Sequence, residues 1–189
     1  FTRKHVTVAL SGDGGDELFA GYDPFNALAP ASLYSSTVPK PLHRLLKGAT
    51  SLLPTSHSNM SLDFKVKRTL LGLDYPAQLW NPVWMSPLSP CELKDVFETP
   101  LSPEQLYSEA IALWDSSGVS SNLGRSLEFY THYYLPDNIL AKADRATMMS
   151  SLESRSIFLD NDLIDFCQQL PQSFKYRRGQ KKYILKKTL

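Results

Sequence analysis

The sequence predicts a mainly helical chain with one clear strand. Residues 6–10 form a short apolar run that leads into a glycine-rich acidic turn, which is typical of a buried strand. Elsewhere, apolar residues recur at the three- and four-residue spacing of amphipathic helices. A lone strand would leave unpaired backbone exposed, so we expect it to belong to a larger sheet or to gain neighbours in a homodimer.

The helices are expected in the following order. Leu18, Phe19 and Tyr22 share one helical face, so a helix is predicted from Asp16 to about Tyr22, and Pro24 is expected to end or bend it. The later expected helices span residues 42–53, 59–73, 104–114, 127–134 and 139–152. Residues 116–121 are expected to form a loop.

Residues 74–103 are rich in proline, so little regular structure is expected there. Trp80 and Trp84 lie in this stretch, and either could stack on an adenine. We interpret them instead as packing anchors.

Composition is that of an ordinary globular domain of 189 residues, with 42% hydrophobic and 21% charged residues. No apolar run approaches the roughly 20 residues needed to cross a bilayer, and Phe1 does not begin a signal peptide, so no membrane contact and a cytoplasmic location are expected. Cys91 and Cys167 fit no disulfide or metal pattern and are expected to be small packing residues. The four histidines are scattered, so no zinc site is predicted.

Net charge is +1, yet the last fifteen residues contain seven basic side chains and no acid. A basic tail can bind nucleic acid. However, Tyr183, Ile184 and Leu185 in this tail require burial, and no nucleic acid partner is therefore expected.

The most informative segment is the turn SGDGGDE at residues 11–17. Its glycines allow left-handed or closely approached backbone, and free N–H groups where a helix begins can cradle a phosphate. Asp13, Asp16 and Glu17 crowd the same place, which is tolerable if a divalent cation lies between acid and phosphate.

Other interpretations of this turn are simpler. Asp and Gly are common in ordinary turns, where Asp16 and Glu17 would only complement a helix dipole. A twelve-residue calcium loop is disfavoured because its alternating ligands are missing. A P-loop is excluded because no lysine follows the glycines.

Three segments together resemble one family. SGDGGDELFAGY (residues 11–22), YLPDNILAKADRATMMSSLESRSIFLD (residues 134–160) and KYILK (residues 182–186) resemble the synthetase domain of glutamine-dependent asparagine synthetases. The resemblance covers essentially the whole chain and is weakest at residues 27–127. It implies the C-terminal part of an adenine-nucleotide α-hydrolase-like (PP-loop ATP pyrophosphatase) α/β domain.

The resemblance also implies a reaction with ATP and Mg²⁺. ATP adenylylates the side-chain carboxylate of aspartate, pyrophosphate leaves, and glutamine-derived ammonia then displaces AMP. Ser11 and Gly12 would contact ATP, and Asp16 would bind magnesium. Asp13 would serve formation of the β-aspartyl-AMP intermediate and take a proton from the amine, while Lys182 would reach the phosphates or the acyl-adenylate. Such charge build-up needs a metal and a lysine to offset it.

Three departures from the family pattern leave the acceptor carboxylate open. Thr147 stands where serine is usual, Ile157 replaces a proline, and Asp13 is the shorter alternative to glutamate. Related amide-forming enzymes, such as β-lactam synthetases or peptide cyclases, share the scaffold and differ at the sequence position that Asp13 occupies here. A non-catalytic helical module descended from the family is the other alternative.

The roles of Lys142, Asp144 and Arg145 also stay open. They could orient substrate or form an ion-pair network with Glu153, Arg155 and Asp160, and we favour support of the scaffold.

Two parts of the family pattern do not occur in this sequence. One is the glutaminase domain with its amino-terminal cysteine, and the other is the pyrophosphate loop SGGxDS. Residues 1–189 are therefore expected to be a partial synthetase domain. We expect this segment to be inactive alone, because catalysis by preorganised charges fails when part of the site is missing.

Overall fold

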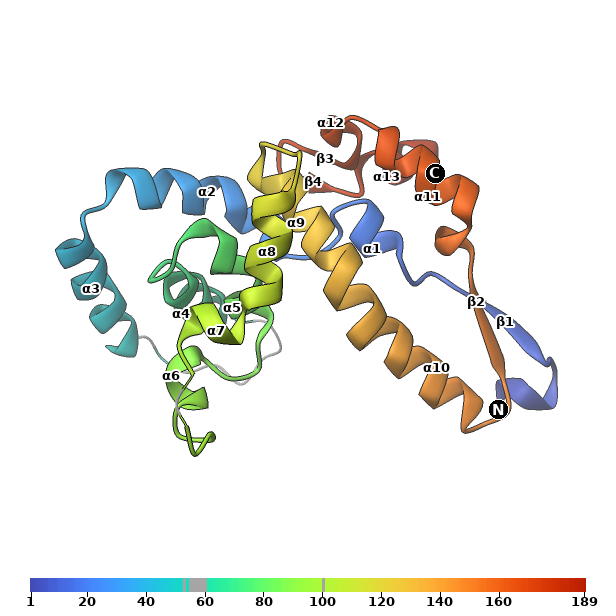
Figure 1. Ribbon diagram of the computed structural model, residues 1–189. Helices are drawn as coiled ribbons and strands as arrows, with labels where there is room; N and C mark the ends of the chain where they lie inside the picture. Colours follow the sequence, from blue (N-terminus) through green and yellow to red (C-terminus); the bar gives the residue numbers. More distant parts are fainter. Residues whose placement is uncertain (53, 55–60, 100) are drawn as a thin grey trace. The chain divides into compact units, whose positions relative to one another are not determined.

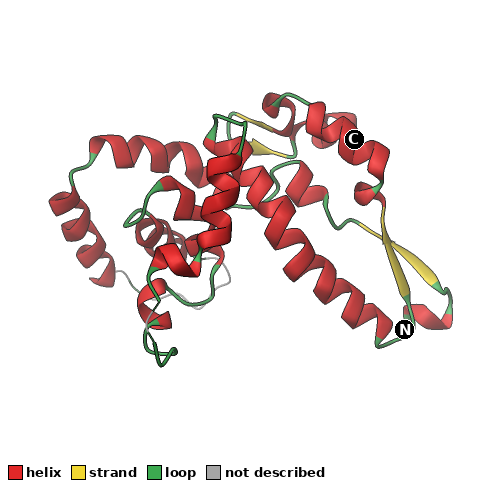
Figure 2. Ribbon diagram, in the orientation of Figure 1, coloured by secondary structure: helices red, strands yellow, loops and turns green. Residues whose placement is uncertain are grey.

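The computed structural model describes residues 1–52, 54, 61–99 and 101–189 (Figure 1). It divides into two compact units, one formed by Phe1–Phe25 with Val119–Leu189 and the other by Asn26–Gly118. Helices dominate both, and the strands are short (Figure 2), which confirms the mainly helical fold class. Among the described helices, none combines the length and apolar character needed to cross a membrane.

Two parallel strands form the main sheet of the first unit. β1 (Val8–Ser11) pairs with β2 (Glu153–Ser156), so that Ser11 lies opposite Ser156. Figure 1 shows β1 in blue beside β2 in orange. The strand expected at residues 6–10 is present with a later start, but its expected burial is wrong, because residues 8–11 are exposed or half-buried. β2 was not predicted. Leu10 is 73% exposed, so the described part of the chain leaves this side chain of β1 uncovered.

The remaining elements of the first unit are mostly short helices. In chain order they are η1 (Thr2–Lys4), α1 (Gly15–Leu18), α9 (Asn122–Phe129), η4 (Tyr130–Leu140), α10 (Ala141–Met148), η5 (Ile157–Leu159), α11 (Asn161–Gln169), α12 (Gln172–Lys175), β3 (Tyr176–Arg177), β4 (Gln180–Lys181) and α13 (Tyr183–Thr188).

One long helical rod replaces the two helices expected at residues 127–134 and 139–152. α9, η4 and α10 follow one another without a break, as the yellow-to-orange rod in Figure 1 shows. η4 is a π-helix, and Pro136 lies inside it. A π turn bonds N–H groups to the carbonyl five residues earlier, and Pro136 is the one position of η4 that cannot donate such a bond.

The basic tail folds back as a hairpin before its last helix. β3 and β4 pair antiparallel across Arg178 and Gly179, which both have positive φ (48° and 81°). Positive φ at both central residues matches the twist of a two-residue hairpin. The turn at Gly179 places Lys181 and Lys182 immediately before α13.

The apolar side chains of the tail are packed as expected. Ile184 and Leu185 lie against the core cluster of Leu18, Phe19 and Cys167. Cys167 is fully buried, and burial raises the pKa of its thiol, as befits an inert packing residue. The expectation of a packing residue is wrong for Cys91, because its side chain lies exposed on the surface of α6.

The second unit contains only helices among its described residues. They are most of α2 (Pro24–Thr37), then α3 (Lys40–Ala49), η2 (Thr50–Leu52), α4 (Leu62–Gly72), η3 (Ala77–Leu79), α5 (Trp80–Met85), α6 (Pro90–Leu93), α7 (Pro103–Leu106) and α8 (Ser108–Ser116). The helix expected at residues 104–114 is therefore present as α7 and α8, and the loop after it is confirmed. Of the helices expected at residues 42–53 and 59–73, positions 53, 59 and 60 lie outside the described residues.

Pro24 begins a helix, and the expectation that it ends one is wrong. α1 stops earlier, at Leu18, and Ala20 follows with a left-handed φ of 53°. That conformation cannot continue a right-handed helix. Pro24 then occupies the first position of α2, where its missing N–H costs nothing.

Trp80 and Trp84 are packing anchors, as expected, but they lie on a helix rather than in irregular structure. Their rings stack with centroids 5.7 Å apart, and both are almost fully buried. Each indole also donates a hydrogen bond, to the carbonyls of Tyr75 and Thr69 respectively. Because both rings are buried and both indole N–H groups are hydrogen-bonded, the pair has no exposed ring face on which a nucleotide base could stack.

An aromatic cluster joins the end of the acidic turn to the long helical rod. Tyr22 stacks on Tyr130 at 4.9 Å between centroids, and Phe25 and Tyr134 contact Tyr130 at 5.1 and 5.6 Å. Tyr130 has no exposed surface, and its hydroxyl has no hydrogen-bond partner within the described residues.

We predict that Tyr130→Phe keeps or raises the stability of the protein, because it removes an unpaired buried hydroxyl that costs about 1 kcal/mol or more. Tyr130→Ala should instead lose about 3 kcal/mol or more through the cavity it creates. Thermal unfolding of both variants tests this. A Phe variant as unstable as the Ala variant would show that the hydroxyl holds a partner.

The turn between β1 and α1 depends on Gly14. Its φ is +85°, and an added Cβ would lie 2.5 Å from Cδ2 of Leu159. Gly12 differs, since a Cβ there would meet no heavy atom within 4 Å.

We therefore predict that Gly14→Ala destabilises the protein by about 1–3 kcal/mol, from backbone strain and the clash with Leu159. Gly12→Ala is the matched control and should change the free energy of unfolding far less. The comparison is made by chemical denaturation. Equal losses in the two variants would contradict the described turn.

Candidate active site

The acidic turn is held in place by two serines at the ends of the paired strands. Ser11 Oγ donates a hydrogen bond of 2.9 Å to Oδ2 of Asp13. Ser156 Oγ, from β2, donates to the backbone carbonyl of Asp13. Asp13 is therefore fixed through both its side chain and its backbone, although its carboxylate stays partly exposed.

Asp16 and Lys182, predicted from opposite ends of the chain, form an ion pair. Lys182 Nζ lies 2.8 Å from Oδ1 of Asp16, and the two side chains are 32% and 39% exposed. The backbone N–H of Lys182 also donates to the carbonyl of Phe19 at 3.0 Å. The tail is thus attached to the acidic turn by its backbone as well as by charge.

Gly21 makes room for this ion pair. A Cβ at Gly21 would lie 2.5 Å from Cε of Lys182 and would overlap the carboxylate of Asp16. Any larger side chain would therefore push the two charged groups apart. Sequence reasoning did not assign a role to Gly21, although it lies in the FAGY part of the motif.

A second ion pair lies beside the first. Lys181 Nζ is 2.5 Å from Oδ1 of Asp23. The hairpin therefore gives its two consecutive lysines different carboxylates, and only Lys182 meets the acidic turn. The two lysines are therefore distinguished by the carboxylate that each one contacts.

Glu17 is turned away from solvent, so it does not act as a third open carboxylate. It is 1% exposed and accepts a hydrogen bond from the hydroxyl of Tyr22. Burial raises the pKa of Glu17, the Tyr22 hydrogen bond opposes that rise, and the charges of Asp16 and Asp13 add to it. The simpler interpretation, in which Asp16 and Glu17 complement the helix dipole, stays open, since both lie in the first turn of α1.

Gly12 leaves an opening beside these charged groups. It is exposed, and the space on its Cβ side is empty to 4 Å. A ligand can therefore approach the backbone between Ser11 and Asp13. The structure places Ser11, Gly12 and Asp13 together in the turn, and it places Asp16 with Lys182; their roles toward ATP and metal stay predictions.

The predicted ion-pair network around Lys142 is largely missing within the described part of the chain. Lys142, Asp144 and Arg145 are exposed on α10. Arg155 pairs with Glu153 at 2.7 Å, because alternate residues of a strand share a face. The sixth predicted member, an aspartate at position 160, caps α11 by accepting backbone hydrogen bonds.

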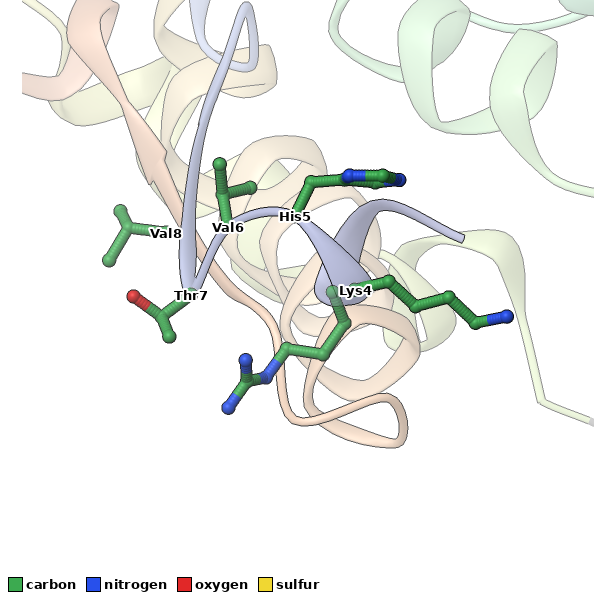
Figure 3. A pocket seen from close by; sticks show the side chains of 6 residues that line it. Lys4, His5, Val6, Thr7 and Val8 are labelled. Carbon is green, nitrogen blue, oxygen red and sulfur yellow. The ribbon is translucent and has the colours of Figure 1, made fainter.

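An open hollow of about 450 Å³ lies away from this site, at residues 3–8. Figure 3 shows its side chains pointing in different directions, with Lys4 and His5 on one side and Thr7 and Val8 on the other. No predicted site residue lines it. Groups that do not converge cannot hold a small ligand, so we do not regard this hollow as the site.

Comparison with known proteins gives one consistent family. Residues 1–189 match the sequence model of the family described as asparagine synthase. The chain is 31% identical over 187 residues to "Asparagine synthetase [glutamine-hydrolyzing] 1" of Bacillus subtilis, covering 98% of this chain and 28% of that protein. It is 33% identical over 189 residues to a "Putative asparagine synthetase [glutamine-hydrolyzing]" of Mycobacterium tuberculosis, covering 99% and 28%.

A more distant relative is a "Putative asparagine synthetase [glutamine-hydrolyzing] 2" of Methanocaldococcus jannaschii, 31% identical over 78% of this chain and 27% of that protein. No solved structure matches. The chain thus spans little more than a quarter of the length of these relatives. The family match nevertheless extends over every residue, and the chain belongs to the asparagine synthase family.

Proposed function

We propose that the protein makes asparagine from aspartate and ATP. The carboxylate of aspartate attacks the α-phosphate, giving β-aspartyl-AMP and pyrophosphate, and ammonia then displaces AMP. The observation that carries this proposal is the Asp16–Lys182 ion pair in the acidic turn of a chain that belongs to the asparagine synthase family.

Lys182 and the turn serve the first step. Attack on the α-phosphate gathers negative charge on oxygens, and an ammonium beside those oxygens stabilises such charge electrostatically. The exposed opening at Gly12 leaves room for the nucleotide to approach the backbone of Ser11 and Gly12.

Asp13 serves the second step. Ammonia attacks the acyl carbon, the bond from that carbon to AMP breaks, and one proton must leave the new amide nitrogen. A positioned carboxylate speeds such a transfer by roughly 10²- to 10⁴-fold. The hydrogen bond from Ser11 orients the Asp13 carboxylate for this task.

The residues present fit a magnesium ion held together with the nucleotide. Asp16 already binds a cationic group, the ammonium of Lys182. The described residues contain no cluster of three or more His, Cys, Asp or Glu side chains able to hold a metal. Mg²⁺ commonly uses one or two carboxylates with phosphates and water, so Asp16 suffices as a protein ligand. The metal would neutralise phosphate charge during adenylylation.

Parts of the enzyme outside residues 1–189 also belong to the proposed function. We propose that ammonia comes from glutamine through a glutaminase domain, since the relatives named above are glutamine-hydrolysing. The exposed Leu10 of β1 supports a further part of the enzyme, or a second subunit, packed on this face of the sheet. We expect the enzyme to work in the cytoplasm.

Two assays separate this function from the alternatives. In the complete protein, formation of AMP and pyrophosphate should require aspartate, and other carboxylates should replace it poorly if the enzyme is not a β-lactam synthetase or peptide cyclase. A non-catalytic module would bind no Mg-ATP in calorimetry.

We predict that Asp16→Asn in the complete protein lowers asparagine formation by at least ~100-fold, because it removes the metal ligand and weakens transition-state stabilisation. Glutaminase activity should stay largely intact. Asp23→Asn breaks the neighbouring ion pair with Lys181 and serves as the control, with little effect expected. Undiminished asparagine formation by the Asp16 variant in saturating magnesium would refute the assignment.

Lys182→Met should stop adenylate formation or its turnover, whereas Lys181→Met should be mild. Both variants remove an ammonium that pairs with an aspartate and keep a long unbranched side chain; Lys181 lies in β4, whereas Lys182 has a left-handed φ of 53°. Aspartate-dependent pyrophosphate release measures the effect. If the two variants behave alike, Lys182 is not the lysine that acts on the phosphates.

A further inference from the structure

Asp16 and Lys182 neutralise each other in the structure, at 2.8 Å. If the function proposed above is right, and this inference depends on it, each group has a different partner during the reaction. Asp16 would bind a divalent cation, and Lys182 would contact phosphate oxygens. The two roles require the ion pair to open when the substrates bind.

The backbone of Lys182 is anchored, while its charged end lies in a partly open place. Its N–H is held by the Phe19 carbonyl, and its own carbonyl accepts from the N–H of Lys186 at 3.0 Å. The side chain, in contrast, is 32% exposed. A lysine ammonium on a flexible four-carbon stem can turn about such an anchor without moving the backbone.

The exposure of the pair also favours an exchange of partners. Both side chains are partly open to solvent, at 32% for Lys182 and 39% for Asp16. An ion pair of this exposure is worth little in water, because both groups are readily solvated. Separating Lys182 from Asp16 therefore costs little free energy, provided that another cation takes the place of Lys182 at Asp16.

A replacement cation is needed because acidic groups crowd the turn. Asp13, Asp16 and Glu17 lie within five residues of one another. Without Lys182, the Asp16 carboxylate would lose the counter-ion that the pair supplies. Lys182 is thus suited to hold the charge balance of the turn until a metal arrives.

We propose that the Lys182 ammonium is an internal counter-ion of Asp16 that competes with the divalent cation and moves to the nucleotide phosphates when the cation binds. Two consequences follow. Lys182 weakens metal binding in the absence of nucleotide. It also couples the two ligands, because phosphates that attract Lys182 free Asp16 for the metal, and such coupling is reciprocal.

The test uses Mn²⁺ as the probe on the complete protein without nucleotide, with binding followed by water-proton relaxation. Lys182→Gln should bind Mn²⁺ about threefold more tightly than the unchanged protein, the size expected for removal of an exposed competing ion pair. Lys182→Arg keeps the charge and should restore the original affinity. Lys181→Gln removes an equal charge that pairs with Asp23, and it should leave Mn²⁺ affinity unchanged.

A second arm adds a non-hydrolysable ATP analogue. The analogue should tighten Mn²⁺ binding more in the unchanged protein than in Lys182→Gln, because only the former has a competing ammonium to remove. Unchanged or weaker nucleotide-free Mn²⁺ binding in Lys182→Gln, while Asp16→Asn abolishes that binding, would overturn the exchange and leave the proposed function standing. Mn²⁺ binding that does not depend on Asp16 would overturn the metal assignment itself, and the exchange with it.

Discussion

The contact between the tail and the acidic turn is the interaction on which the site depends. Lys182 donates its backbone N–H to Phe19, and the absence of a side chain at Gly21 lets its ammonium reach Asp16. The hairpin β3–β4 delivers Lys182 to this point, and the apolar residues of α13 hold it there by packing on the core around Phe19. Apolar packing therefore determines where the charged groups meet.

Charge in the turn is divided between a buried and an open part. Glu17 is enclosed and hydrogen-bonded to Tyr22, which itself stacks on Tyr130 of the long helical rod. Asp13 and Asp16 stay partly exposed. Of the three acidic side chains, one thus fixes the turn to the scaffold, while the other two stay partly open to solvent.

Much of the fold could be predicted from local pattern, and the errors have physical causes. The strand before the turn and the packing of Ile184 and Leu185 against the core follow from apolar runs in the sequence, although the strand itself is not buried. β2 could not be found in this way, because its sequence ESRS lacks apolar residues and becomes a strand only by pairing with β1. The uninterrupted rod was missed because a proline normally ends a helix, whereas here the chain continues as a π-helix around Pro136. The importance of Lys182 over Lys181 came from family resemblance, since the two neighbours differ only in which aspartate they meet.

A structure of the complete protein with Mg²⁺ and α,β-methylene-ATP tests the central claim most directly. The account predicts the metal on the Asp16 carboxylate, the Lys182 ammonium on a phosphate oxygen, and the backbone hydrogen bond from Lys182 to Phe19 unbroken. A nucleotide bound elsewhere, or one bound in the turn with Asp16 and Lys182 still paired, would contradict it.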